Sequence, residues 1–351
     1  MGKKGSLRQV DFIIVGQGLA GSLLAYELIK REKSVVLIDE CSQQTSSRRA
    51  AGIYNPITGR KMVKTWMADD LFSILEAYYS ELENELNSTF LHKMNIYRPF
   101  ASVEEQNDWQ GRLTSQGYDS FVKDLLQDEL GIPYIKDPAG GLMLQNSGYV
   151  DLPILINSFR EYFKALGVFQ NEVFNYEQLT EQNGSITYKE FTSRYIIFCD
   201  GVGVMRNPYF SDLKFRIVKG ELLKLKSTFN LKQIVNRGVF MIPRDGKIQV
   251  GSTYNHDDLT WESTDEGRSD LIERLSKIYI GEKVVENQTA GLRPATFDRR
   301  PFLGWSSKSE LVGIFNGLGA KGVSLAPYWS QKMAEFVLGK EELPAEVALY
   351  R

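Results

Sequence analysis

Residues 11–39 constrain the fold more than any other part of this 351-residue chain. They begin with the apolar run DFIIV, continue through the glycine-rich turn GQGLAG and the helical pattern LLAYELIKRE, and end with the apolar run SVVLID. This order predicts a βαβ unit. In the turn, Gly16 permits the tight bend, Gly18 permits close approach of a pyrophosphate, and Gly21 permits close packing of helix on strand.

Asp39 strengthens this interpretation because it ends the second predicted strand. An acid at this place accepts hydrogen bonds from the ribose hydroxyls of an adenosine. Asp39 is preferred to Glu40 because it follows the buried strand directly. The unit therefore predicts a dinucleotide site. It leaves FAD and NAD(P) open, although no arginine precedes Arg48 to receive a 2′-phosphate.

A second glycine-rich turn, NGLGAKGVSLAP, occupies residues 316–327. The apolar run LVGIF precedes it and a helical pattern follows it. Turns between a strand and a helix present backbone N–H groups to an anion. The chain therefore has two candidate anion sites, one near each end.

Composition limits the classes of function. Lys and Arg number 42 against 44 Asp and Glu, so no overall basic field favours nucleic acid. Cys41 and Cys199 are the only cysteines and lie in no CxxC or Cys/His cluster. We therefore expect neither a disulfide framework nor a metal site. The apolar stretch 12–29 contains the glycine turn, so we expect no membrane span and a cytoplasmic protein.

Periodicity predicts how the chain is organised. Helices are expected at 70–90, 104–130, 152–166 and 268–280, and residues 139–150 form a hairpin-like connection. Residues 214–255 alternate with period two, which predicts an antiparallel sheet. Strand-rich parts interrupt the α/β parts, so interleaved domains are expected.

Five segments in a fixed order carry a family resemblance. After the first turn come SSRRAAGIYNP at 46–56, VFMIPRDGKIQVGST at 239–253, AGLRPATFDRRPFLG at 290–304 and the second turn. Together they resemble the D-amino-acid oxidase superfamily of FAD enzymes, most closely its glycine-oxidase and sarcosine-oxidase branch. The resemblance covers about residues 11–339 and is weakest over 70–135.

The resemblance implies an α/β protein with a glutathione-reductase-like, Rossmann-type FAD-binding domain. An α+β substrate domain built on an antiparallel sheet is interleaved with it. The FAD-binding domain is predicted to comprise 1–80, 140–213 and 285–351, and the substrate domain 81–139 and 214–284. Non-covalent FAD is expected, because neither cysteine lies in the segment that carries covalent flavin in part of the sarcosine-oxidase group.

The resemblance also implies which residues contact FAD. They are Gly16, Gly18, Gly21 and Asp39 at the ADP half, Ser47, Ala50, Ala51 and Gly52 along the pyrophosphate and ring, Val173 near the adenine, Gly201 in a strand-end loop, and Gly317, Gly319 and Gly322 over the flavin ring.

Arg293 matches the arginine that binds the substrate carboxylate in this branch. A guanidinium pairs bidentately with a carboxylate and fixes the amine carbon over the flavin. An internal salt bridge is the competing interpretation. Weaker catalytic candidates in the same pocket are Tyr54, Met241 and Tyr254.

The second turn departs from its family at two positions. Leu318 stands where a histidine is frequent, and Lys321 adds a cation that many relatives lack. One hypothesis is that Lys321 stabilises reduced flavin or superoxide. The alternative is a surface lysine before a helix.

The expected reaction is oxidation of the C–N bond of an amino acid or a carboxylate-bearing secondary amine. Hydride passes to flavin N5, and the electron acceptor is O₂ or a carrier. Alternatives are a dehydrogenase that reduces a quinone or carrier, and a flavin-binding protein without turnover. Oxidation of a carboxymethylaminomethyl group on tRNA is a third alternative, which the basic residues Arg48, Arg49, Lys61 and Lys64 would suit.

Overall fold

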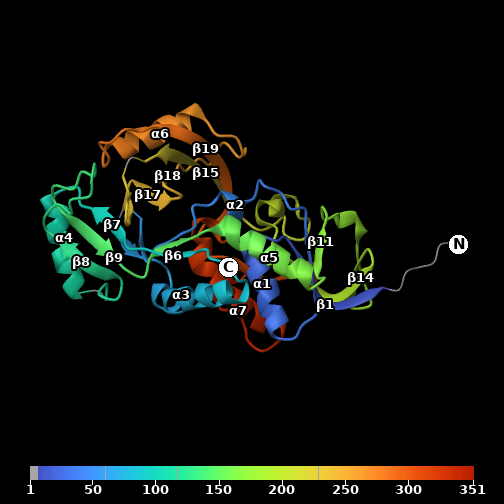
Figure 1. Ribbon diagram of the computed structural model, residues 1–351. Coiled ribbons are helices and arrows are strands. Elements are labelled where there is room, and N and C mark those ends of the chain that lie inside the picture. Colours follow the sequence, from blue (N-terminus) through green and yellow to red (C-terminus); the bar gives the residue numbers. More distant parts are fainter. Residues whose placement is uncertain (1–6, 60, 116, 228) are drawn as a thin grey trace.

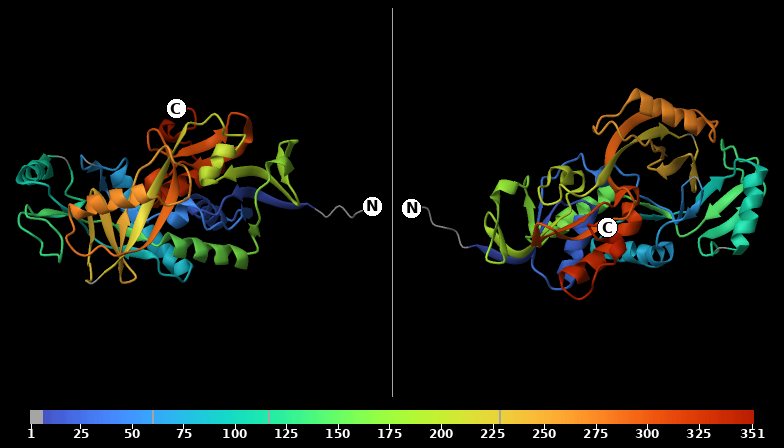
Figure 2. Two further views of the ribbon diagram at one scale, coloured as in Figure 1. Left: turned by 90° about the horizontal axis from the view of Figure 1, so that it is seen from above. Right: turned by 180° about the vertical axis from the view of Figure 1, so that it is seen from behind.

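The computed structural model describes residues 7–351 except 60, 116 and 228. Two large sheets and two small ones make up its strands. In all views the two large sheets lie side by side along the long axis of the molecule (Figures 1 and 2). Strands β1 and β14 lie near one end, and helix α4 and strand β8 lie at the other.

The first large sheet has the order β11-β2-β1-β14-β13-β12, with β21 beside β14 and β20 beside β21. Its strands are β1 (Arg8–Val15), β2 (Val35–Asp39), β11 (Phe169–Asn171), β12 (Leu179–Gln182), β13 (Ser185–Tyr188), β14 (Phe191–Phe198), β20 (Phe302–Ser306) and β21 (Ser309–Asn316). Strands β11, β2, β1, β14 and β21 are parallel. The central residues of β1, β2, β14 and β21 are apolar and buried, as strands covered on both faces require, whereas β11 is not buried.

Three helices pack near this sheet. They are α1 (Leu19–Lys30), α5 (Leu152–Ala165) and α7 (Gly322–Val337). Figure 1 shows them close together beside β1. Helix α5 begins with Asp151, whose carboxylate accepts a hydrogen bond from the N–H of Ile154, and Gly167 follows it with φ +67°. These are the start and stop signals expected of a helix.

The second large sheet has the order β19-β15-β18-β17-β16-β7-β9-β8. Its strands are β7 (Ile96–Pro99), β8 (Val122–Leu126), β9 (Gly141–Leu144), β15 (Phe215–Lys226), β16 (Ile234–Arg237), β17 (Val239–Arg244), β18 (Lys247–Gly251) and β19 (Val285–Thr296). All its pairs are antiparallel except β16 with β7. Helix α6 (Asp265–Ser276) contacts β15, β17 and β18, and α4 spans Val103–Ser115.

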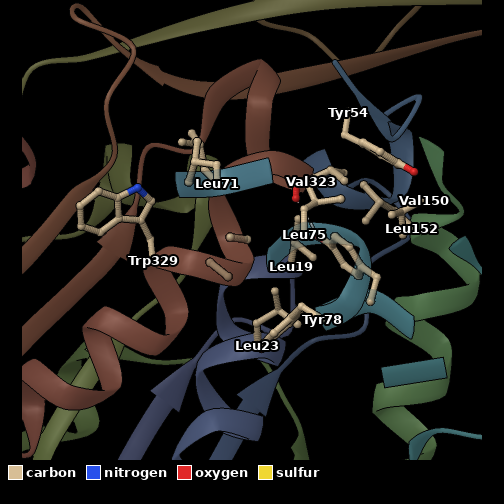
Figure 3. Packing of buried hydrophobic residues seen from close by; sticks show 14 of the residues in the cluster. Leu19, Leu23, Tyr54, Leu71, Leu75, Tyr78, Val150, Leu152, Val323 and Trp329 are labelled. Carbon is tan, nitrogen blue, oxygen red and sulfur yellow. Dashed lines mark hydrogen bonds between the residues drawn. The ribbon is translucent and has the colours of Figure 1, made fainter. Parts of the chain in front are cut away.

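The small sheets and one helix connect the two large units. The three-stranded sheet joins β3 (Ile53–Tyr54), β10 (Gly148–Val150) and β6 (Leu91–Lys93), and the two-stranded sheet joins β4 (Ile57–Thr58) and β5 (Val63–Lys64). Helix α3 (Ala68–Glu85) packs on α7. Figure 3 shows the apolar core between these parts, formed by Leu19, Leu23, Tyr54, Leu71, Leu75, Tyr78, Val150, Leu152, Val323 and Trp329.

Two sequence expectations about secondary structure need correction. The helix predicted for 104–130 ends at Ser115, and Val122–Leu126 forms strand β8 because it pairs with β9. The expected hairpin at 139–150 is absent, since β9 pairs with β7 and β8 whereas β10 pairs with β3 and β6. Strands β9 and β19 lie in the second sheet, although the predicted boundaries assign them to the FAD-binding domain.

No helix in the described part of the chain is long and apolar enough to cross a membrane.

Gly52 provides a test of the packing between β3 and β10. It has φ +79°, and a Cβ at this position would lie 2.0 Å from the carbonyl oxygen of Val150. Gly52→Ala should lower the thermal unfolding midpoint by about 5 °C or more, because it adds both backbone strain and a clash. Gly111→Ala is the control, since nothing beyond its own helix lies within 4 Å of the added Cβ. It should leave the midpoint unchanged or raise it. Equal midpoints for both variants would contradict this packing.

Candidate cofactor and substrate site

A cavity of about 460 Å³ is lined by residues from both large sheets. Its lining includes residues of the first glycine turn, of the segment 39–53, of the turn that follows β14, of β15 and β19, and of the second glycine turn. The two glycine turns, far apart in sequence, therefore open into one space.

The first glycine turn has the geometry that its sequence predicts. Gly16 has φ +101°, and a Cβ there would lie 2.5 Å from the carbonyl oxygen of Cys199. A Cβ on Gly21 would lie 1.9 Å from the carbonyl oxygen of Gly16, so helix and turn pack without a side chain between them. Gly18 is the N-cap residue of α1 and has no side chain that could cap the helix, and the N–H of Leu19 donates to Ser47 Oγ. The other backbone N–H groups of this first turn are available to a pyrophosphate.

Asp39 is held at the mouth of this turn by two backbone groups. Its Oδ2 accepts a hydrogen bond from the N–H of Gln17 at 2.7 Å, and its Oδ1 accepts one from the N–H of Cys41 at 2.7 Å. Arg160 Nη2 lies 3.6 Å from Oδ1. Arg160 also donates through Nε to Gln17 Oε1 at 2.9 Å. The sequence did not indicate that Gln17 and Arg160 belong to the site, because α5 meets the turn only in the folded chain.

The segment after β2 follows the floor of the cavity. Ser47 Oγ accepts a hydrogen bond from the N–H of Leu19 at 3.0 Å, which ties this segment to the start of α1. Ser47, Ala50, Ala51 and Gly52 all line the cavity. Small side chains here leave room for a bound group.

The second glycine turn is anchored by a polar network at the end of β14. Asn316 Nδ2 donates to Asp200 Oδ1 at 3.0 Å and to the carbonyl oxygen of Gly201 at 2.9 Å. Asn316 Oδ1 accepts from the N–H of Gly317 at 2.8 Å. Burial raises the pKa of Asp200 to about 6. No sequence pattern indicated that Asp200 and Asn316 belong to the site. They meet because β14 and β21 are neighbouring strands.

The predicted glycines of these loops differ in their positions. Gly201, Gly319 and Gly322 line the cavity. Gly317 does not; it has φ +82°, and a Cβ there would lie 2.8 Å from Thr296 Cγ2. Gly317 thus shapes the turn without lining the cavity.

Arg293, on β19, faces the cavity from the second sheet. Its Nη2 donates to Ser252 Oγ at 2.7 Å and its Nη1 to the carbonyl oxygen of Thr253 at 3.3 Å. Its guanidinium carbon lies 4.7 Å from the ring centre of Tyr254. Burial lowers the pKa of Arg293. No Asp or Glu among the described residues forms an ion pair with it, so the competing salt-bridge interpretation is not supported.

Two aromatic side chains of one loop belong to the same cavity lining as Arg293. Tyr254 and Trp261, at the two ends of residues 254–261, line the cavity. Lys219, which is only 1% exposed, forms an ion pair with Asp258 and donates to Thr260 Oγ1 at 3.2 Å. This buried lysine holds the middle of the loop in place. The sequence did not reveal it, because the contact joins residues about 40 positions apart.

The predicted site residues that lie outside the cavity include Met241, Tyr54 and Val173. Met241 is 0% exposed in the core beside α6, whereas Phe240 lines the cavity, because successive side chains of a strand point to opposite faces. Tyr54 is 0% exposed and hydrogen-bonded to Glu76 Oε1 at 3.1 Å, so it is a core residue. Val173 is 68% exposed and follows β11 without reaching the cavity.

Lys321 also lies outside the set of residues that line the cavity. Its Nζ lies 3.2 Å from Thr65 Oγ1, behind the second glycine turn. Burial, together with the charge of Arg299, lowers the pKa of Lys321 to about 8. Its neighbour Leu318 does line the cavity. The hypothesis of direct contact between Lys321 and a flavin is therefore not supported by its position.

The other basic residues of this region divide into two groups. Lys64 forms an ion pair with Asp69 at 2.7 Å, and neither Lys61 nor Lys64 lines the cavity. Arg48 Nη2 donates to Asn157 Oδ1 at 2.6 Å and turns toward α5. Arg49 alone of these four residues lines the cavity. Among the described residues, no cluster of three His, Cys, Asp or Glu side chains could hold a metal ion.

Comparison with known proteins gives a family match. The sequence profile of the FAD dependent oxidoreductase (DAO) family matches residues 11–336. The bifunctional protein ThiO/ThiG of Synechocystis sp. is 23% identical over 95% of this chain and 52% of its own length. The chain thus spans about half the length of such curated relatives.

Two solved structures share the fold over nearly the whole chain. Glycine oxidase from Geobacillus kaustophilus has a TM-score of 0.80 at 21% identity, with 98% of this chain and 99% of that chain covered. Iminodiacetate oxidase from Chelativorans sp. BNC1 has a TM-score of 0.80 at 20% identity, with 97% and 100% covered.

Asp39 and Glu40 give a paired test of the dinucleotide site. Asp39→Ala should raise the dissociation constant of FAD by about 30-fold or more, because it removes a charged acceptor and leaves two backbone N–H groups unpaired. Glu40→Ala should change it by less than about threefold, because Glu40 takes no part in this network. Titration of apoprotein with FAD, followed by flavin fluorescence, measures both. Equal losses in the two variants would contradict the assignment.

Lys321 gives a pH-dependent test. The unfolded chain holds the lysine proton up to about pH 10.4, whereas the folded chain releases it near pH 8. Between these values the unfolded state binds more protons, so this residue's contribution to stability rises with pH. The unfolding midpoint of the wild type minus that of Lys321→Met should therefore increase from pH 8 to pH 10. Lys277→Met, at an exposed lysine, should show a constant difference. A constant difference for Lys321→Met would refute the lowered pKa.

Proposed function

Because the chain belongs to the FAD dependent oxidoreductase (DAO) family, we propose that it oxidises a small amine that bears a carboxylate. The observation that carries this proposal is Arg293. Its guanidinium is buried in the cavity, it is held by neutral oxygen acceptors, and no acid of the described chain neutralises it. A buried cation without a partner is costly unless a ligand supplies the opposite charge.

The residues of the cavity fit FAD. The glycines of the first turn permit close approach of the backbone to a bound group, and the first turn of α1 offers N–H groups to the pyrophosphate. Asp39 offers carboxylate oxygen to the ribose. When bound, FAD supplies the hydride acceptor of the reaction. The protein supplies binding, orientation and electrostatics.

Arg293 orients the substrate. A planar guanidinium can form two parallel hydrogen bonds to one carboxylate, which fixes the adjoining amine carbon in a defined place. Ser252 and Thr253 hold the guanidinium from one side, and the ring of Tyr254 lies against it. Among the described residues that line the cavity there is no histidine. Positioning, not a histidine proton relay, is therefore what this chain contributes.

Room for the guanidinium depends on one glycine. A Cβ on Gly220, in the neighbouring strand β15, would lie 1.9 Å from Arg293 Nη2. Any side chain at this position would displace the guanidinium. Gly220 and Arg293 therefore act together in binding an anion, because the missing side chain of Gly220 leaves room for the guanidinium.

Two of the structural neighbours carry the names glycine oxidase and iminodiacetate oxidase. Substrates of this kind agree with a cavity in which Arg293 offers a carboxylate site beside the cofactor space. The tRNA alternative receives less support, because Lys61 and Lys64 do not reach the cavity.

Anaerobic mixing with a panel of amino acids and N-alkyl amino acids tests the proposal. At least one carboxylate-bearing amine should bleach the yellow flavin, and its decarboxylated analogue should not. Return of colour in air would identify O₂ as acceptor, and return only with a quinone would indicate a dehydrogenase. A flavin that stays yellow with every amine would support the non-catalytic alternative.

Arg293→Ala tests the role of this residue in that reaction. The second-order rate of flavin reduction by the best amine should fall by about 10²- to 10³-fold, because two charge-assisted hydrogen bonds are lost. Arg216→Ala is the matched control, since Arg216 lies exposed on β15 and contacts Phe297. It should change the rate by less than about twofold. A comparable fall in both variants would refute the assignment.

A further inference from the structure

Arg49 is a second arginine that lines the cavity. It ends the short helix α2 (Ser46–Arg49), and its Nε is buried without a hydrogen-bond acceptor. No ion pair in the described chain includes it. A buried guanidinium donor left unpaired is expensive, so its acceptor is expected to come from a bound molecule.

The geometry of the second sheet brings Arg49 close to Arg293. Gly291 of β19 lies directly opposite Gly220 of β15. A Cβ on Gly291 would lie 2.7 Å from Arg49 Cβ, and a Cβ on Gly220 would lie 1.9 Å from Arg293 Nη2. Cross-strand Cβ positions are about 5 Å apart, so the base of Arg49 and the head of Arg293 lie within roughly 10 Å of each other. Two facing glycines thus accommodate two arginine side chains.

The surroundings leave both charges available to a ligand. Of the acids that line the cavity, Asp39 and Glu40 belong to the dinucleotide end, and Asp200 is hydrogen-bonded to two asparagine amides. None of them is hydrogen-bonded to Arg49 or Arg293. This part of the cavity therefore receives the side chains of two arginines to which no acid of the lining is hydrogen-bonded.

Arg48 shows that the orientation of Arg49 is specific. These neighbours belong to the same short helix, but Arg48 donates to Asn157 on α5 and is absent from the cavity lining. Arg49 instead contacts β19 of the second sheet. Two anionic groups on one ligand would neutralise both arginines.

We propose that Arg49 and Arg293 bind the two carboxylates of one substrate, an amine whose nitrogen lies between two carboxylate-bearing arms. This inference rests on the proposed function for the role of Arg293 and extends it to the substrate class. Arg293 holds one carboxylate, Arg49 holds the other, and the amine carbon lies between them. A monocarboxylate amine engages Arg293 alone and leaves Arg49 unpaired.

A pair of unreactive ligands tests this without turnover. Oxydiacetate has two carboxylates joined through an ether oxygen, and methoxyacetate has one carboxylate on the same kind of chain. Neither contains an amine. Titration of the FAD-loaded protein, followed by the flavin absorption spectrum and by calorimetry, should show that oxydiacetate binds about 30-fold more tightly. Equal dissociation constants would overturn the proposal.

Variants of the two neighbouring arginines locate the effect. In Arg49→Gln the two ligands should bind within about threefold of each other, through loss of affinity for oxydiacetate only. Arg48→Gln, the matched control, should keep the 30-fold preference. Arg49→Lys, which keeps the charge, should recover part of the preference. If Arg49→Gln keeps the preference but weakens FAD binding, Arg49 belongs to the cofactor site and the proposal is wrong.

The result separates this inference from the proposed function. If monocarboxylate amines bleach the flavin but oxydiacetate shows no preference, the two-carboxylate inference fails and the proposed function stands. If oxydiacetate shows the preference but no amine of either class bleaches the flavin, amine oxidation fails while the two-carboxylate site stands.

Discussion

The parallel pairing of β1, β14 and β21 is the constraint on which the rest of the structure depends. Val15 lies opposite Phe198, and Phe198 lies opposite Ile314. Three strands from distant parts of the chain therefore end at one edge of one sheet, where doubly wound folds bind their ligands. The loops that leave this edge are the first glycine turn, the segment that begins at Asp200, and the second glycine turn. Asn316 joins the last two, so the cavity has a fixed wall before any ligand arrives.

The second sheet contributes the positive charge of Arg293 to the cavity. Its two longest strands, β15 and β19, pair so that glycine faces glycine at the point where the sheet meets the cofactor space. The missing side chains leave room for the guanidinium of Arg293, and Ser252 fixes its direction. Buried cations whose acceptors are neutral or absent cost free energy in the empty protein. They recover that cost when an anionic ligand binds, which is the arrangement that a preorganised binding site requires.

The parts that the sequence could predict are those set by local backbone chemistry. The turn at Gly16, the acid at Asp39, the order of strand and helix and the antiparallel sheet followed from local spacing and periodicity, and the family resemblance added Arg293. The parts that it could not predict depend on pairing between distant segments. Strand β8 replaced an expected helix because β9 lies beside it. Met241 was assigned to the wrong face because the register of β17 is fixed only by its neighbours, and Lys219 pairs with a loop whose path no local pattern specifies.

The central claim is that one cavity holds FAD on the glycine turns and a carboxylate on Arg293. A crystal structure of the FAD-loaded protein with methoxyacetate bound tests it most directly. We expect the carboxylate to bind the guanidinium of Arg293, above Gly220, and the FAD pyrophosphate to lie at the start of α1. A carboxylate bound elsewhere, or Arg293 paired with an acid of the protein itself, would contradict the account.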